Sequence, residues 1–338
     1  MLGGRPVGIL GTGAYVPEAI LTNEQLSKMV DTSDEWIRSR TGIRERHIAA
    51  ANQATSDLAL VASQRALEVA GLKPDDLDMI VVGTATPDYP FPSTACRLQH
   101  KLGATRCGAM DVSAACTGFV YALNTGASFI ASGQAKNVLV LGAEILSRIT
   151  DYSDRNTCVL FGDGAGAVVL SAGAPHRFLG GAMHADGKDP DVLSLPAGGS
   201  VLPASQRTID EKKHFVTLRG RDIFRFAVTR MVELVEAAAA AQGVKVEDVR
   251  LIIPHQVNAR IIEAAVDKIG LPQERIYCNI ERFGNTSTAS IPMALDEVVK
   301  KGMLKQGDLV VFVAFGGGLT WASATVRPPA SRPAPSRT

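Results

Sequence analysis

The chain has 338 residues, of which 46% are hydrophobic and 20% are charged. This balance excludes a disordered chain, a coiled coil and a fibrous repeat, and the length indicates two domains or one large fold of two halves. The formal net charge is +1, from 35 basic and 34 acidic side chains, which disfavours nucleic acid as a partner because duplex binding usually needs a basic excess.

The cysteines indicate a reducing compartment rather than a disulfide framework or a zinc site. Their number is odd and no pair has the Cys-x-x-Cys spacing; they are Cys96, Cys107, Cys116, Cys158 and Cys278. No apolar run approaches the roughly 18 residues that a membrane span needs. Gly11 and Gly13 interrupt the first apolar stretch too early for a signal peptide. We therefore expect a cytoplasmic protein with no metal and no membrane partner.

Hydrophobic periodicity predicts helices with one apolar stripe that alternate with strands of continuous apolar residues, the kind that is covered on both faces of a sheet. In chain order these are helix Thr55–Ala70, strand Met79–Val82, helices Ser93–Leu102 and Gly118–Ala131, strands Val138–Leu141 and Ala167–Leu170, helix Asp222–Gln242, strand Leu251–Ile253, helices Ala259–Ile269 and Ile291–Lys301, and strand Leu309–Val313.

The two halves of the chain resemble each other. Residues 66–82 match residues 238–254, and residues 138–141 match 310–313, at one offset of about 172 residues. This offset predicts a duplicated unit and, with the alternating elements, an α/β layered sandwich. We expect an N-terminal half over 1–172, a C-terminal half over 173–326 and a disordered tail over 327–338, because the tail is almost entirely Pro, Ala, Ser and Arg.

Two glycine motifs resemble dinucleotide fingerprints but lack the required context. In the first, which starts at Gly11, Val16 stands in place of the third glycine and Pro17 prevents the helix that should follow. The second, residues 162–167, runs into a predicted strand where the fingerprint needs a helix. We interpret it as a glycine-rich turn where backbones approach closely.

Cys116 differs from the other cysteines in its surroundings. It follows a short strand and small residues and precedes a predicted helix, so it lies at a helix N-terminus, where free N–H groups favour the thiolate. A buried cysteine that acts as a small hydrophobe is the alternative.

His255 and Asn285 are the other candidates for chemistry. His255 ends an apolar strand and follows Pro254, and ligands of α/β sheets gather at such strand ends, although a satisfied core histidine is equally compatible. Asn285 lies between a glycine and a Thr/Ser cluster before a helix, where it could also be a helix cap. The glycines 316–318 follow a buried strand and leave backbone N–H groups unobstructed, as in an oxyanion hole. A cysteine, a histidine, an asparagine and bare N–H donors together indicate nucleophilic acyl transfer.

At these motifs the sequence resembles the β-ketoacyl-acyl-carrier-protein synthase III family of thiolase-fold condensing enzymes. The resemblance covers residues 5–327, and its motifs, in this order along the chain, are Asp31–Arg44, Ala114–Phe119, Phe161–Gly166, Pro254–Asn258, Gly284–Ser287 and Phe315–Gly318. It implies a duplicated α-β-α-β-α sandwich.

The resemblance also implies a mechanism in two stages. Cys116 takes the acyl group of a short acyl-CoA, such as acetyl-CoA, while the backbone N–H groups of Cys116 and Gly317 hold the oxyanion. Malonyl-acyl-carrier protein then loses CO₂ beside His255 and Asn285, and its enolate attacks the acyl-cysteine. No cofactor is implied, because acyl-CoA is a substrate. His255 is expected to be neutral in an apolar site.

Further positions are implied by the same resemblance. CoA contacts are expected at Trp36 in an exposed loop, and at Arg40, Arg155 and Asn258. The acidic carrier protein is expected at Arg225, Arg260 and Lys268. Phe91 is expected to reach the acyl pocket of the partner subunit in a homodimer and to favour short primers.

Two alternatives stay open at this point. A related condensing enzyme of secondary metabolism would use a different primer or acceptor. A papain-like cysteine hydrolase also presents Cys, His and Asn in this order. This alternative is disfavoured because the papain-like sequence signature is missing from this chain and the papain-like fold has no half-chain repeat.

Overall fold

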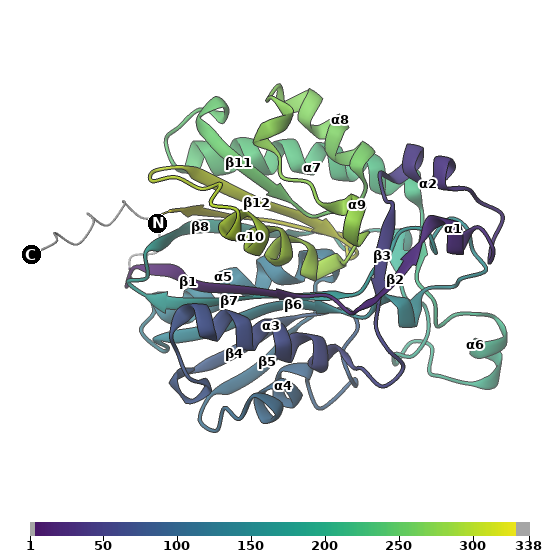
Figure 1. Cartoon of the computed structure of the whole chain (residues 1–338), viewed down its shortest axis with the longest axis horizontal. Helices are drawn as coiled ribbons and strands as arrows, with labels where there is room; N and C mark the ends of the chain where they lie inside the picture. Colours follow the sequence, from purple (N-terminus) through teal and green to yellow (C-terminus); the bar gives the residue numbers. More distant parts are fainter. Residues whose placement is uncertain (1–3, 329–338) are drawn as a thin grey trace, which may run out of the picture.

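The computed structural model describes residues 4–328 and places the strands in one large sheet (Figure 1). The nine strands of this sheet have the order β11-β12-β13-β8-β1-β7-β6-β4-β5. Their bounds are β1 Val7–Tyr15, β4 Met79–Gly83, β5 Gly108–Val112, β6 Asn137–Glu144, β7 Gly164–Ala172, β8 His176–Ala185, β11 Val249–Pro254, β12 Leu309–Gly316 and β13 Thr320–Arg327.

Helices divide the molecule into alternating layers. The central helices, α5 and α10, pack against both halves of the sheet, while α3 and α4 cover the outer face of the first half and α7 and α8 that of the second (Figure 1). The predicted layered α-β-α-β-α sandwich is therefore confirmed. The helix bounds are α3 Thr55–Ala70, α4 Thr94–Leu102, α5 Gly118–Ala131, α7 Gly220–Ala241, α8 Ala259–Ile269 and α10 Ser290–Lys300.

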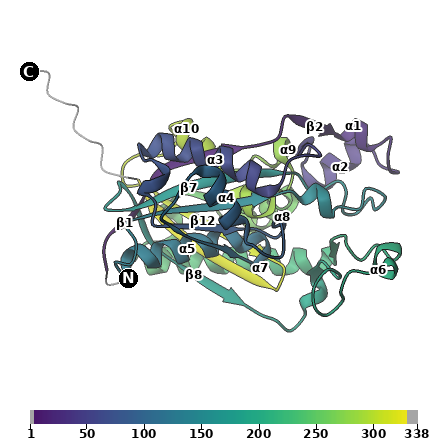
Figure 2. The same ribbon diagram turned by 90° about the horizontal axis from the view of Figure 1, so that it is seen from below.

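Short elements gather at one end of the molecule, where α1, α2 and α6 extend beyond the sheet in both ribbon views (Figures 1 and 2). Two of them carry Leu193 and Leu218, which line the site described below. They are β2 Ala19–Thr22, α1 Asn23–Leu26, α2 Asp34–Thr41, β3 Glu45–Ile48, β9 Leu193–Ser194, α6 Gln206–Asp210, β10 Thr217–Leu218 and α9 Ile280–Phe283.

The repeat seen in the sequence recurs in the elements. α5 begins at Gly118 and α10 at Ser290, a separation of 172 residues, and β6 and β12 begin at Asn137 and Leu309 with the same separation. The two half-sheets meet where β1 pairs with β8 through Gly8–Arg177 and Ile9–His176. The expected boundary after residue 172 falls at the end of β7.

Most predicted elements occur with nearly the predicted bounds, because their apolar patterns are local. β1, β8 and β13 were not predicted. In β1 the reason is packing: a Cβ on Gly11 would lie 2.3 Å from the Ala66 carbonyl oxygen, and one on Gly13 would lie 2.4 Å from that of Ala62. The two glycines thus let α3 lie directly on β1. This packing explains the glycines of the motif that was rejected as a dinucleotide fingerprint.

One boundary differs from the expectation. β13 extends to Arg327, since its backbone pairs with Arg177 of β8, so the tail does not begin at residue 327. Residues 329–338 lie outside the described residues. In the described part of the chain, no helix is long and apolar enough to cross a membrane, and no group of His, Cys, Asp and Glu side chains could hold a metal ion.

Candidate active site

Cys116 lies in a strained turn between a strand and a helix. β5 ends at Val112, the 3-10 turn η2 spans Ala115–Thr117, and α5 follows at once. Ala115 has a φ of 44°, a left-handed conformation that non-glycine residues seldom adopt and that often marks functional sites. A Cβ on Gly83 would lie 2.4 Å from the Gly118 carbonyl carbon, so the start of α5 rests directly on the end of β4.

The environment of the Cys116 thiol corrects the expectation of a resting thiolate. Burial raises the pKa of Cys116 to about 11; a hydrogen bond with the Ser287 side chain opposes this rise, and the charge of Glu144 adds to it. Desolvation and a nearby anion therefore outweigh the helix N-terminus. The resting nucleophile is a neutral thiol.

His255 follows β11 and is fully buried. Its Nδ1 lies 2.8 Å from Ser290 Oγ, and its ring meets Phe315 edge to face at 5.7 Å between centroids. Burial lowers the pKa of His255 to about 3, in agreement with the expected neutral imidazole. Nε2 is buried and has no hydrogen-bond partner among the described residues, so it is available to a substrate.

Asn285 is held by the turn that follows it. Its Oδ1 accepts a hydrogen bond of 2.8 Å from the backbone N–H of Ser287. Its own backbone N–H donates to the Leu160 carbonyl, and its carbonyl accepts from Gly162. With Oδ1 occupied in this way, the two N–H bonds of the side-chain amide are left for the pocket.

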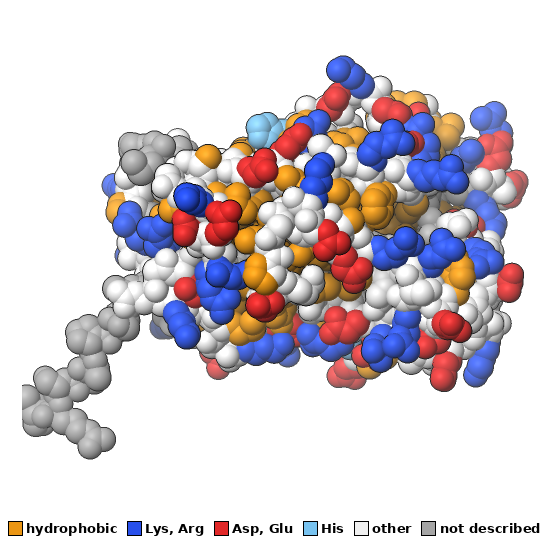
Figure 3. Space-filling view, turned by 90° about the horizontal axis from the view of Figure 1, so that it is seen from above, with side chains coloured by type: hydrophobic (Ala, Val, Ile, Leu, Met, Phe, Trp, Pro, Cys, Tyr) orange, Lys and Arg blue, Asp and Glu red, His pale blue; other side chains and the backbone are white. Residues whose placement is uncertain are grey.

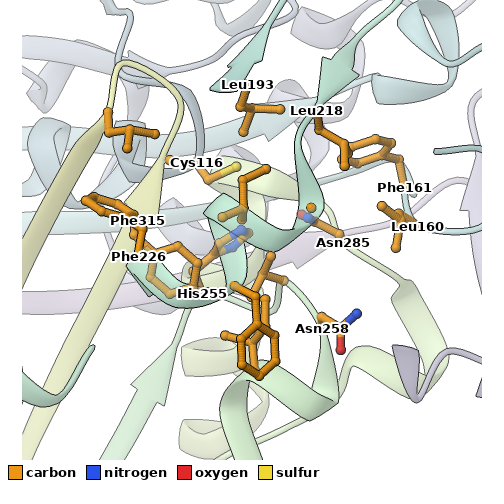
Figure 4. Close-up of a pocket in the computed structure, with 17 residues that line it drawn as sticks. Cys116, Leu160, Phe161, Leu193, Leu218, Phe226, His255, Asn258, Asn285 and Phe315 are labelled. Carbon is orange, nitrogen blue, oxygen red and sulfur yellow. The ribbon is translucent and has the colours of Figure 1, made fainter. Parts of the chain in front are cut away.

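Cys116, His255 and Asn285 line one pocket of about 150 Å³, although they come from different halves of the chain (Figure 4). The close-up shows these three side chains bordering a common space below Leu193 and Leu218. The other lining side chains are mostly apolar and include Leu160, Phe161, Ile223, Phe224, Phe226, Val257, Ile261, Phe315 and Leu319.

The glycine run after β12 lies against the nucleophile. A Cβ on Gly316 would lie 2.7 Å from the Cys116 nitrogen, so a side chain there would displace the turn. Gly316 lines the pocket, and Gly317, the predicted oxyanion donor, is the next residue. Thr117 Oγ and Thr320 Oγ lie 2.8 Å apart and join the two turns.

The predicted CoA residues are partly clustered. The Arg155 guanidinium carbon lies 4.4 Å from the centroid of the Trp36 ring, and that of Arg40 lies 5.7 Å from it. Asn258 lines the pocket and donates through Nδ2 to the Arg40 carbonyl at 3.1 Å. Trp36 is partly buried in α2, which Ser33 caps, and not in the exposed loop that its charged neighbours suggested.

The remaining predicted positions lie on the surface. Arg225 on α7, and Arg260 and Lys268 on α8, are exposed, and these two helices pack together. The face seen in Figure 3 shows basic and acidic side chains around a central stretch of hydrophobic ones. Phe91 is 85% exposed.

Two residues at the site were not singled out from the sequence. Ser290 contacts His255, and Glu144 is a fully buried carboxyl beside the turn of Ser287 and Thr288. Ser290 is part of the polar cluster after Asn285, and this cluster was the sequence feature from which Ser290 could have been identified. No local pattern marks Glu144, which ends an ordinary apolar strand.

The fold and the site define a thiolase-fold condensing enzyme, an acyltransferase. Sequence models described as 3-oxoacyl-[acyl-carrier-protein] synthase III and as its C-terminal part match residues 110–187 and 239–328. The chain belongs to the β-ketoacyl-[acyl-carrier-protein] synthase III family.

Individual relatives agree along nearly the whole chain. The synthase III of Caldanaerobacter subterraneus subsp. tengcongensis is 52% identical over 321 residues, which cover 95% of this chain and 97% of the relative. That of Xanthomonas campestris pv. campestris (strain ATCC 33913) is 53% identical over 322 residues, which cover 94% and 97%. The Aquifex aeolicus enzyme has a solved structure with a TM-score of 0.87 at 46% identity, covering 95% of this chain and 99% of that one.

A structure from secondary metabolism is also similar. The priming β-ketosynthase of the R1128 polyketide pathway has a TM-score of 0.88 at 33% identity, covering 97% of this chain and 98% of that one. Identity to the curated synthase III relatives is higher, at about 52%, so these comparisons favour the initiation of fatty acid synthesis over the alternatives.

Proposed function

We propose that this enzyme joins a short acyl-CoA, such as acetyl-CoA, to malonyl-acyl-carrier protein with loss of CO₂ and forms 3-oxoacyl-acyl-carrier protein through an acyl-Cys116 intermediate. One observation carries the proposal: a thiol, an imidazole nitrogen without a partner and an oriented carboxamide line the same apolar pocket.

In the first stage, Cys116 attacks the thioester carbonyl of acyl-CoA and CoA leaves. Negative charge develops on the carbonyl oxygen, where backbone N–H groups that already point at it stabilise the transition state. The close contact between Gly316 and the Cys116 nitrogen supports a donor pair made of the N–H groups of Cys116 and Gly317.

In the second stage, malonyl-acyl-carrier protein loses CO₂ and leaves an enolate. Asn285 donates from its side-chain amide, and His255 donates from Nε2 in the tautomer that carries the proton there. Both groups are held by protein hydrogen bonds before substrate arrives, so they need little reorganisation as charge develops. The enolate carbon then attacks the acyl group on Cys116.

The substrates reach this pocket from the surface. The Trp36–Arg155 pair with Arg40 supports a site for the nucleotide of CoA, and Asn258 lies between it and the pocket. Exposed Arg225, Arg260 and Lys268 suit an acidic carrier protein. The scheme uses no metal and no redox cofactor.

The side chain of Phe91 supports a homodimer. A phenyl ring that is 85% exposed on one chain is suited to insertion into a partner, where it would shorten the acyl pocket. We therefore expect short primers to be preferred. The chain is proposed to act in the cytoplasm.

Intact-mass spectrometry tests the proposal. After incubation with acetyl-CoA, the wild-type chain should gain one acetyl group and the Cys116→Ser variant none, while Cys116→Ser should still decarboxylate malonyl-acyl-carrier protein. Absence of the adduct on the wild type would disprove the acyl-cysteine. A panel of acyl-CoA primers should show short chains turning over fastest, and equal turnover of dodecanoyl-CoA would contradict the role of Phe91.

A further inference from the structure

We propose that Glu144 is a positioning residue for Asn285: its buried carboxyl holds the turn that orients the Asn285 side-chain amide, and it thereby controls the loss of CO₂ without touching the substrate. This inference rests on the proposed function, because it concerns the stage in which Asn285 donates to the malonyl thioester. It implies that the two half-reactions of the enzyme depend on Glu144 to different degrees.

The orientation of the Asn285 amide depends on one hydrogen bond. The backbone N–H of Ser287 donates to Asn285 Oδ1 at 2.8 Å, and this contact leaves the N–H bonds of the amide to the pocket. Rotation of the amide by half a turn would place Oδ1 in the pocket instead. An oxygen there would repel the developing enolate, so the second stage depends on the position of the Ser287 N–H.

The backbone of Ser287 needs support from its surroundings. Ser287 has a φ of 48°, a left-handed conformation that costs a non-glycine residue free energy and persists only where neighbouring groups hold it. It begins the 3-10 turn η7, Ser287–Ala289, which rests on β6, because a Cβ on Gly142 would lie 2.1 Å from the Thr288 carbonyl oxygen. A change in this turn would move the Ser287 N–H away from Asn285.

Glu144 supplies this support. Its carboxyl is fully buried at the end of β6, and Oε1 accepts from the hydroxyls of Ser287 and Thr288 at 3.0 Å each; we call these two hydrogen bonds the Glu144 link. Three further donors, all in the loop after β4, anchor the same carboxyl: the hydroxyls of Thr84 and Thr86 and the backbone N–H of Ala85. Glu144 therefore ties a turn of the second half of the chain to two strand ends of the first.

This role requires hydrogen bonding and not a negative charge. Burial raises the pKa of Glu144, which brings its neutral form closer to physiological pH. A neutral carboxyl keeps a carbonyl oxygen that accepts hydrogen bonds, and the hydroxyls of Ser287 and Thr288 can each donate or accept. The Glu144 link therefore persists in either protonation state.

The decisive variant is Ser287→Ala/Thr288→Val, which removes both hydroxyls of the Glu144 link and keeps the Ser287 N–H. The kcat for decarboxylation of malonyl-acyl-carrier protein without acyl-CoA should fall about 10- to 100-fold, up to the cost of losing one oxyanion donor. The KM should change less than about twofold, because the turn acts in the transition state and not in binding. Decarboxylation at the wild-type rate would overturn the proposal.

The first half-reaction shows whether the effect is confined to the second. Acylation of Cys116 by acetyl-CoA uses backbone N–H donors and not the Asn285 amide, so the double variant should keep its acylation rate within about threefold of the wild type. Intact-mass kinetics measures this rate. A parallel loss of both half-reactions would show a general distortion of the pocket and would refute the positioning of Asn285.

A double-mutant cycle with Asn285→Ala separates positioning from any other structural effect. In the Asn285→Ala background, cutting the Glu144 link should change the decarboxylation rate less than about twofold, because the group that the link orients is absent. Independent effects would multiply. A further loss of about tenfold in that background would therefore contradict the proposal.

Substitutions of Glu144 itself test the same link, and they serve also if the double variant fails to fold. Glu144→Ala removes the link and should lower decarboxylation at least as much as the double variant. Glu144→Gln should stay within about threefold of the wild type, because an amide can accept from or donate to the two hydroxyls. A Gln variant as slow as the Ala variant would rule out a role through these hydrogen bonds.

The matched control is Thr12→Val. The Thr12 hydroxyl donates to Asp296 Oδ1 at 2.9 Å and both side chains are buried, so this substitution also removes a hydroxyl from a buried carboxyl. Thr12 lies on β1, outside the lining of the pocket. Thr12→Val should lower stability and leave both half-reactions unchanged, and a loss of decarboxylation equal to that of the double variant would refute the positioning role.

The wild type distinguishes failure of this inference from failure of the proposed function. If the wild type forms no acyl-Cys116 with acetyl-CoA, the proposed function fails and this inference fails with it. If the wild type is acylated and decarboxylates malonyl-acyl-carrier protein, and the variants of the Glu144 link behave like it, only the positioning role fails.

Discussion

At the scale of single residues, burial sets the charge of the two titratable groups in the pocket. Removal from water raises the pKa of Cys116 to about 11 and lowers that of His255 to about 3, so both are neutral at physiological pH. The site therefore holds its nucleophile as a thiol until a base acts on it. A resting thiolate–imidazolium pair is not the ground state of this pocket.

This state of His255 predicts a pH dependence of stability. Between pH 6.5 and about 3 the unfolded chain binds a proton at His255 that the native chain does not. Protonation of His255 therefore favours the unfolded chain in this range, so the native state has its full stability above pH 6.5 and loses stability as the pH falls. From pH 7 to 5 the expected loss in the free energy of unfolding is about 2 kcal/mol. Urea denaturation at both pH values measures this loss. In His255→Gln the free energy of unfolding should fall by about 2 kcal/mol less than in the wild type between pH 7 and 5.

The control for this prediction is His100→Gln, because His100 is exposed on α4. It should lose as much stability as the wild type over the same change of pH. An undiminished loss in His255→Gln would show that His255 takes up its proton in the folded protein.

At the scale of elements, the contact between β4 and α5 positions the nucleophile. Gly83→Ala would place a Cβ 2.4 Å from the Gly118 carbonyl carbon, and backbone on both sides leaves no flexible atom to yield. We expect the free energy of unfolding to fall by about 1–3 kcal/mol and acylation of Cys116 to slow, because α5 must move. Chemical denaturation and intact-mass kinetics measure the two effects.

A glycine without such a contact is the control for Gly83. Gly71 ends α3 with a φ of 66° and has no heavy atom near its ideal Cβ position. Gly71→Ala should cost about 1 kcal/mol through backbone strain alone and leave acylation unchanged. Equal effects of both substitutions on acylation would show that the packing of α5 does not position Cys116.

A polar clamp joins α9 to α10 on either side of the Asn285 turn. Glu297 accepts from the Arg282 guanidinium at 2.7 and 2.8 Å, from Asn279 Nδ2 at 2.9 Å and from the Tyr277 hydroxyl at 2.8 Å. Burial alone would raise the pKa of Glu297, but these donors outweigh it and the pKa is lowered. The clamp therefore depends on the ionised carboxylate.

Glu297→Gln tests this clamp. At pH 7 the free energy of unfolding should fall by about 1–2 kcal/mol, since the pair with Arg282 is partly exposed to solvent. The difference from the wild type is complete above the unfolded pKa, about 4.5, and should shrink as the pH falls through the lower native value. Urea denaturation at pH 7 and pH 4 measures it, and a difference that grows in acid would contradict a lowered pKa.

At the scale of the whole molecule, duplication places the site between two similar units. Cys116 comes from the first half, and His255 and Asn285 come from the second, so neither half holds the full set. The inner helices α5 and α10 carry the two turns to the seam, where η2 and the equivalent turn η7, Ser287–Ala289, lie against each other. Catalysis by this chain requires both halves to be folded.

Association of two chains is the prediction at this scale. Light scattering should give twice the mass of one chain for the wild type, and Phe91→Asp should shift it towards the monomer because a charge would be buried at the interface. Val69→Asp, on an α3 side chain that is 60% exposed, should leave the mass unchanged. A wild-type monomer, or an unchanged mass in Phe91→Asp, would contradict the proposed dimer.

The sequence by itself determined the features that depend on neighbouring residues and on the repeat. The apolar periodicity of α3, α5 and α8, the helix end at Gly71 and the turns around Cys116, His255 and Asn285 are all local patterns. Strands such as β1 and β8 were not predicted from the sequence. Their glycines and mixed residues are explained only by the packing of these strands against α3 or a neighbouring strand.

Only the tertiary structure decided the state of the site. Glu144 and Ser287 are 143 residues apart in the sequence, and their hydrogen bond exists because the two halves pack together. The helix-start position of Cys116 suggested a thiolate, but the desolvation of the thiol and the charge of Glu144 are properties of three-dimensional packing, and they reversed that expectation. A pKa depends on everything within a few ångströms in space, and the order of residues along a chain does not record that distance.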